Sequence, residues 1–159
     1  NESSAASDVY KRQRMHHCMR LIGAGQRCLE LACQRVEDRE TFGKKLSQHQ
    51  SIRENIAKSY AELEMARLLV HKTCWHIDHH GVKPSIELIS ATKISVPLMV
   101  QAIIDRCMQM HGAGGLTEDW CMAEQFNYAR WCRQADGPDE VHQMALGKRI
   151  IQQYAEASS

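Results

Sequence analysis

The stretch that decides the fold is S-I-E-L-I-S-A-T-K-I-S-V-P-L-M-V-Q-A-I-I-D-R-C-M-Q-M-H, residues 85 to 111. Its apolar residues recur every three or four positions, the spacing that lines one face of an α-helix. Pro97 lacks an N–H and clashes with the carbonyl four residues back. Because the apolar period resumes directly after it, we expect a kink beside Val96 and not the end of the helix.

The segments on either side of this stretch show the same helical period. The pattern predicts further helices near residues 15–39, 48–80, 118–133 and 138–154. Ser47 and Thr117 are expected to cap helix starts, Gly81 to end the second helix, and Pro84 to enter the first turn of the third. With no alternating segment, the sequence predicts an all-α protein without strands, an up-and-down helical bundle of about five helices.

The two ends of the chain do not share this pattern. Residues 1–13 are small and polar, so we interpret them as a linker or non-native segment and exclude them from the fold. The patterned domain is predicted to span residues 14–155, with 156–159 as a tail.

Composition narrows the class of protein. The 20 Lys and Arg residues nearly balance 19 Asp and Glu, which argues against a nucleic-acid partner. No apolar run approaches the roughly 20 residues that span a bilayer, so we expect no membrane span. Seven cysteines, an odd number without a C-x-x-C pair, predict reduced, core-facing thiols and therefore an intracellular protein.

Three local motifs each have a structural and a functional interpretation. His76 and His80 are spaced as zinc ligands, but no third ligand is evident, so exposed helix histidines are favoured and no metal site is predicted. The glycine-rich run 111–116 is a helix cap and turn, or a loop that lets a ligand approach the backbone. The acidic turn 136–140 is a helix start, or a turn with at least one carboxylate that has another purpose.

Taken together, these motifs resemble the acyl-CoA dehydrogenase family. R-E-T-F-G (39–43) lies between the first two helices, a Gln-x-x-Gly-rich turn follows the third, and an acidic Asp-Gly turn precedes the last. Two sequence segments are most similar to family members ten and eleven: A-D-G-P-D-E-V-H (135–142) and R-M-H-H-C-M-R (14–20). The resemblance covers about residues 14–151 and implies the family's C-terminal helical domain.

The resemblance also implies a reaction. Family members use FAD to remove the α and β hydrogens of acyl-CoA thioesters, in fatty acid oxidation. Asp136 falls where the family has its catalytic base, although the usual residue there is Glu, one methylene longer. Gly137 would flank the acyl thioester, and Arg14 would lie near the CoA portion.

The residues implied to contact FAD fall in three segments. Some would reach flavin that is bound mainly by a neighbouring subunit, which implies a homodimer or homotetramer. Ala113 replaces a glycine that is common in the family's turn. The segments are Arg39, Thr41 and Phe42; Gln109, Met110, His111, Gly112 and Ala113; and Pro138, Asp139 and Glu140.

Two other functions remain open at this point. A non-catalytic helical oligomerisation module would keep the bundle without the chemistry, and an acyl-CoA oxidase would pass electrons to oxygen. For the dehydrogenase, an electron-transfer flavoprotein is one candidate partner, and the sequence does not determine the electron acceptor. The expected location is a mitochondrion or peroxisome in a eukaryote and the cytoplasm in a bacterium.

Overall fold

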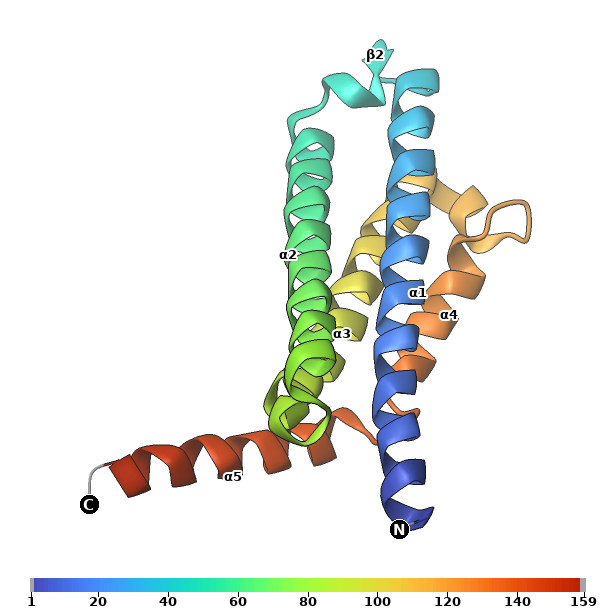
Figure 1. The fold of residues 1–159 in the computed structure, drawn as a ribbon. Coiled ribbons are helices and arrows are strands. Elements are labelled where there is room, and N and C mark those ends of the chain that lie inside the picture. Colours follow the sequence, from blue (N-terminus) through green and yellow to red (C-terminus); the bar gives the residue numbers. More distant parts are fainter. Residues whose placement is uncertain (1, 158–159) are drawn as a thin grey trace.

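The computed structural model describes residues 2–157, and it describes the side chains from residue 11 onward together with that of residue 9. Five α-helices make up the fold (Figure 1). They are α1 (Glu2–Asp38), α2 (Gln50–His80), α3 (Ile86–His111), α4 (Met122–Cys132) and α5 (Asp139–Ala157). The predicted all-α helical bundle is confirmed.

The middle helices begin and end close to the predicted residues. Gly81 caps the C-terminus of α2 with a φ of 82°, as expected. Pro84 lies in the short 3₁₀ helix η2 (Lys83–Ser85) directly before α3, and α3 continues through Pro97. Ser47 does not cap α2, however, because the chain forms the 3₁₀ helix η1 (Leu46–Gln48) there and α2 follows His49.

Two helix starts differ from the prediction. The first helix begins at Glu2 and not near residue 15, because a helix that is nucleated by packing propagates through residues that have no apolar stripe. Whether residues 1–13 are a linker stays a prediction. The fourth helix begins at Met122, since the 3₁₀ helix η3 (Gly112–Leu116) precedes it and the Thr117 hydroxyl bonds the Gly114 carbonyl at 2.8 Å and not a helix N–H.

The expectation of no strands was wrong in one loop. Between α1 and α2 the chain forms a two-residue antiparallel pair, β1 (Glu40–Thr41) and β2 (Lys44–Lys45). Phe42 and Gly43 form the turn, with φ values of 53° and 77°. Two central residues with positive φ are typical of the tight turn that joins antiparallel strands. A ladder this short leaves no alternating pattern in the sequence, and the bundle is unaffected.

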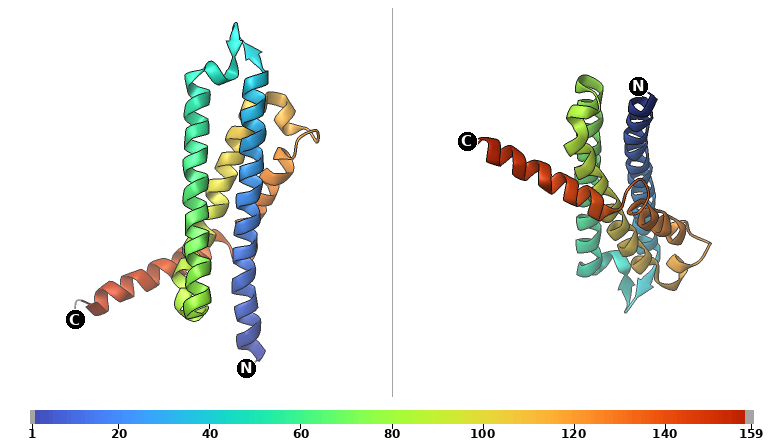
Figure 2. Two further views of the ribbon diagram at one scale, coloured as in Figure 1. Left: turned by 45° about the horizontal axis from the view of Figure 1, so that its top comes forward. Right: turned by 90° about the horizontal axis from the view of Figure 1, so that it is seen from below.

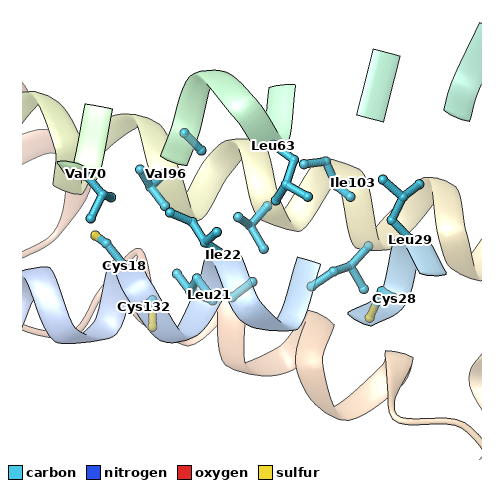
Figure 3. Close-up of a cluster of buried hydrophobic side chains, with 14 of the residues drawn as sticks. Cys18, Leu21, Ile22, Cys28, Leu29, Leu63, Val70, Val96, Ile103 and Cys132 are labelled. Carbon is cyan, nitrogen blue, oxygen red and sulfur yellow. The ribbon is translucent and has the colours of Figure 1, made fainter. Parts of the chain in front are cut away.

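The core surrounds α3. This helix packs against α1, α2, α4 and α5, while α5 itself leaves the bundle (Figures 1 and 2). Figure 3 shows the buried cluster, with Leu21 of α1, Leu63 of α2 and Val96 and Ile103 of α3 pointing toward one another. By length and composition alone, the segment Lys83–Leu116 could cross a membrane. Its apolar residues instead fill the centre of the bundle, as the sequence pattern of a core helix requires.

Four of the seven cysteines belong to this core. Cys18, Cys28, Cys107 and Cys132 are buried, and the other three are partly exposed. Burial raises the pKa of Cys18 and of Cys107 to about 12. These thiols therefore behave as small apolar side chains, as predicted.

The packing of α2 on α1 and α3 gives a testable expectation. Leu63 is fully buried, and a Cβ added at Gly25 would lie 3.3 Å from its Cδ1, so Leu63→Ala should lower the free energy of unfolding by about 2–5 kcal/mol. Leu68 of the same helix is 67% exposed, and Leu68→Ala should change it by less than about 0.5 kcal/mol. Urea denaturation of both variants measures the contrast, and equal losses would contradict the packing described.

Candidate active site

The connection between α4 and α5 is a tight turn with an unusual backbone. Asp136 has a φ of 56° and Gly137 a φ of 103°. The left-handed region is uncommon for a residue other than glycine, although Asp and Asn enter it more readily than most. The backbone N–H of Asp139 bonds the carbonyl of Arg133 at 3.1 Å and closes the turn. The chain thus holds the Asp136 side chain on a constrained turn and not on a helix face.

The side chain of His142, in α5, holds this turn in place. Its Nε2 lies 3.2 Å from the backbone carbonyl oxygen of Asp136, to which it donates a hydrogen bond. Burial lowers the pKa of His142, so the ring stays neutral near pH 7. A Cβ on Gly137 would lie 2.9 Å from the same Nε2, so position 137 has room only for glycine.

A buried ion pair holds the start of α5. Arg133 donates from Nε to the Asp139 carboxylate at 2.8 Å and from a second nitrogen to Gln101 of α3 at 3.1 Å. The side chain of Asp139 is 8% exposed. This carboxylate is therefore engaged in the joint between α3, α4 and α5, whereas Pro138 and Glu140 are exposed beside it.

Lys93 of α3 holds the end of α4. Its side chain is fully buried, and its ammonium group donates a hydrogen bond to the carbonyl of Cys132, the last residue of α4. Burial lowers the pKa of Lys93, while the nearby carboxylates of Asp139 and Asp136 act in the opposite direction. A cation at this place suits the negative end of the helix dipole.

The Asp136 side chain itself faces α1. Its Oδ2 lies 3.4 Å from Nε2 of His17, and Nδ1 of His17 lies 3.0 Å from the hydroxyl of Tyr128. The Asp136 side chain is 20% exposed. Arg14 lies one turn before His17 on α1, and its buried Nε has no hydrogen-bond partner in the described part of the chain. The charge of Arg14 also contributes, after burial, to the lowered pKa of His142.

The structure therefore brings together the three residues that were predicted to serve substrate and catalysis: Arg14, Asp136 and Gly137. It does not bring the predicted flavin residues of the first loop to them. From Arg14 to the end of α1 is about 36 Å along the helix. Arg39, Thr41 and Phe42 lie at that far end, on the hairpin that Figure 1 shows at one end of the bundle.

The second predicted flavin segment lies at the C-terminal end of α3, about 24 Å along that helix from Lys93. Gln109, Gly112 and Ala113 are exposed there. Met110 and His111 are each 5% exposed and face the core. The ring of His111 packs edge-on against Trp120, its Nδ1 bonds a backbone carbonyl, and its buried Nε2 has no partner in residues 2–157. Gly112 is the C-cap of α3, in line with the structural interpretation of the glycine-rich run.

The histidine pair on α2 has ordinary partners. Nδ1 of His76 lies 2.8 Å from the Ser85 hydroxyl, and the ring of His80 packs against those of His76 and Trp75. Among the described residues, no group of three or more His, Cys, Asp or Glu side chains is placed to hold a metal ion.

Sequence reasoning missed the residues that support the turn: His17, Lys93, Arg133 and His142. His17 stands in the quoted string 14–20 and His142 in the string 135–142, but neither pattern shows what these rings contact. Lys93 interrupts an apolar helix, and that was the one available signal, because a lysine on a core face needs a buried partner.

Comparison with known proteins identifies the class. Residues 4–151 match the model of the family described as acyl-CoA dehydrogenase, C-terminal domain. The chain belongs to the acyl-CoA dehydrogenase family and represents its C-terminal helical domain. It is 47% identical over 135 residues to acyl-CoA dehydrogenase family member 10 of Mus musculus, which covers 85% of this chain and 13% of that protein. Identity to acyl-CoA dehydrogenase family member 11 of Gallus gallus is 44% over 135 residues, covering 85% of this chain and 17% of that protein.

Solved structures agree in fold. A protein of Mycobacterium abscessus assigned as an acyl-CoA dehydrogenase is 40% identical, with a TM-score of 0.87 over 89% of this chain and 35% of its own. A glutaryl-CoA dehydrogenase of Mycobacterium smegmatis, solved in complex with FADH2, is 28% identical, with a TM-score of 0.81 over 86% of this chain and 35% of its own. The chain thus spans about a third of these structures and less than a fifth of the two relatives. The predicted resemblance to family members ten and eleven is confirmed.

The geometry of the turn predicts opposite outcomes for two glycines. Gly137→Ala combines a φ of 103° with a Cβ 2.9 Å from His142, so it should lower the free energy of unfolding by about 1–3 kcal/mol. Gly147, in the middle of α5, has nothing within 4 Å of an added Cβ, and Gly147→Ala should raise that free energy by about 0.5–1 kcal/mol. Thermal or urea unfolding compares them; a stabilised Gly137→Ala variant would refute the described turn.

Proposed function

We propose that this chain is the C-terminal domain of an FAD-dependent dehydrogenase that removes the α and β hydrogens of acyl-CoA thioesters, with Asp136 as the α-proton base. The observation that carries the proposal is the Asp136 carboxylate: part-buried, held on a left-handed turn, and not consumed by an ion pair with Arg or Lys. Membership of the acyl-CoA dehydrogenase family gives the reaction class.

The proposed reaction requires Asp136 to act as a base. A base must lie within hydrogen-bond reach of the substrate Cα–H and must accept the proton as the hydride leaves Cβ. Asp136 has one carboxylate oxygen beside His17, which leaves the other free to accept a proton. Asp139 is less suited to the role: Arg133 binds its Oδ2, and its Oδ1, although without a hydrogen-bond partner in the described residues, is buried.

The substrate would lie across the same turn. Gly137 has no side chain, and its backbone N–H follows the base directly, so the thioester would lie against its backbone. Arg14, partly buried and with one nitrogen unpaired, supplies positive charge for an anionic part of coenzyme A. Both assignments rest on the family resemblance together with the proximity of these residues to Asp136.

The residues proposed for FAD suit an external ligand. Phe42 is 97% exposed on a turn with positive φ, and Arg39, Gln109 and Ala113 are exposed as well. An exposed guanidinium fork matches the pyrophosphate of a dinucleotide. Bound FAD would supply the hydride acceptor of the reaction. Met110 and His111 would contribute through the backbone, because their side chains face the core.

This chain does not make a whole site. It spans about a third of the solved family structures, and two of the three segments proposed to contact FAD, 39–42 and 109–113, lie far from its proposed base. We expect the isolated chain to be inactive, with the rest of the pocket supplied by other domains and subunits.

The first test concerns Asp136 in the full-length flavoprotein. Asp136→Asn keeps the shape and removes the proton acceptor, so flavin reduction by acyl-CoA should slow by about 10²–10⁴-fold while flavin content is retained. Stopped-flow absorbance of the flavin measures the reduction. Asp105→Asn, an exposed acid on α3, is the matched control and should leave the rate unchanged. Undiminished reduction in Asp136→Asn would place the base elsewhere.

The second test concerns assembly. If Arg39 and Gln109 serve FAD bound mainly by another subunit, the intact flavoprotein must be a dimer or a dimer of dimers. The projecting helix α5 agrees with this, since Met144 and Ile151 are each 71% exposed on its surface. Sedimentation of the full-length holoprotein should show a dimer or tetramer. A monomer that retains stoichiometric flavin would contradict the proposal.

A further inference from the structure

The His17 side chain is held on three sides by residues from the other end of the chain. Its Nδ1 lies 3.0 Å from the Tyr128 hydroxyl, and its Nε2 lies 3.4 Å from Oδ2 of Asp136. Trp131 packs against the ring edge, with centroids 5.6 Å apart and planes at 73°, and Trp131 also stacks on Tyr128. Contacts at both ring nitrogens and at the ring edge hold the imidazole of His17 in one orientation.

The chemistry of the partners assigns the protons. Ionised Asp136 can only accept, so the tautomer with its hydrogen on Nε2 is the one in which His17 attracts Oδ2 across the 3.4 Å contact. In a neutral ring Nδ1 then accepts, and the Tyr128 hydroxyl is its donor. Burial, the largest influence, raises the pKa of Tyr128, which keeps that hydroxyl protonated. The three side chains thus form a directional chain from phenol to imidazole to carboxylate.

We propose that His17 is a positioning residue for the proposed base: it anchors one carboxylate oxygen of Asp136 and aims the other at the substrate, while Tyr128 sets the tautomer of His17. The proposal rests on the proposed function of Asp136. It adds a role for His17 and Tyr128 that the family match does not assign. A hydrogen-bonded partner that orients a reacting group commonly changes activity by about 10–100-fold when it is removed.

No other described side chain within hydrogen-bond distance holds the Asp136 carboxylate. His142 bonds its backbone carbonyl, and Lys93 bonds the carbonyl of Cys132. These two fix the turn, whereas His17 alone fixes the rotation of the side chain. Removing His17 should therefore leave the turn and the flavin in place and disturb the aim of the carboxylate.

The experiment is a double-mutant cycle in the full-length flavoprotein, read by the rate of flavin reduction at saturating acyl-CoA and by the substrate concentration at half-maximal rate. His17→Ala should slow reduction about 10–100-fold with little change in that concentration or in flavin content. In the Asp136→Asn background the same change should cost less than about threefold, because there is no base left to aim. His16→Ala is the matched control, an exposed histidine on the adjacent position of α1.

Two further measurements keep the outcome decisive. Added imidazole should restore part of the lost rate in His17→Ala and none in Asp136→Asn. If His17→Ala does not fold, His17→Gln, which retains an amide donor, and Tyr128→Phe enter the same cycle, each with a smaller loss that vanishes in the Asp136→Asn background.

The outcomes separate the two proposals. Normal reduction in Asp136→Asn overturns the base assignment and this inference with it. Slow reduction in Asp136→Asn with normal reduction in His17→Ala, or equal losses from the His17 change in both backgrounds, overturns the role of His17 alone.

Discussion

The burial of α3 is the constraint on which the rest of the structure depends. Its apolar residues do not form one stripe: Ile89, Val96, Val100, Ile103 and Ile104 are all essentially inaccessible to water. A single neighbour can cover only one side of a helix, so such a helix must be enclosed by several. The chain meets this demand by laying α1, α2 and α4 around α3 and by starting α5 against it. The turn that carries Asp136 lies where it does because α4 ends, and α5 begins, on α3.

Enclosing α3 also determines which polar groups can be buried. Lys93 lies on it with its ammonium group against the last carbonyl of α4, and Arg133 returns from the turn to Gln101 of α3 and to Asp139. Each buried charge would be costly without these partners. The same contacts hold both ends of the Asp136 turn. Core packing and the stiffness of the proposed active site are therefore one network and not two.

Much of the bundle could be predicted from the sequence because its helices are long, periodic and separated by Gly or Pro. Where local signals compete, prediction failed. Thr117 is a residue type that often caps helices, but its hydroxyl bonds the Gly114 carbonyl instead. The hairpin at Phe42 and Gly43 is too short to produce an alternating pattern of apolar and polar residues. The start of α1 was missed because propagation of a helix requires no apolar stripe.

The candidate site, too, could be predicted only in part. Asp136 could be located because an Asp-Gly pair before a helix marks a turn, and the family resemblance gave it a role. Its supports could not be found in this way. His17 and Asp136 lie at opposite ends of the chain, and only the packing of α1 against α4 and the turn brings them together. Periodicity within a window of one sequence carries no information about such a contact.

Under the proposed role, Asp136 stands where the family resemblance implies a Glu, and the shorter residue suits the local backbone. With a φ of 56°, this residue stands in the left-handed region, which Asp and Asn enter several-fold more readily than other non-glycine residues. A Glu here would gain a methylene of reach and would lose that conformational preference. Gly137, with its φ of 103°, and the hydrogen bond from His142 hold the backbone of residue 136 in place. A short carboxylate on a constrained turn has fewer rotamers than a long one on a loose loop, so less entropy is lost when it is aimed. Under the proposed role, the short Asp side chain suits this strained turn. A Glu on this turn, or an Asp on a looser loop, would serve less well.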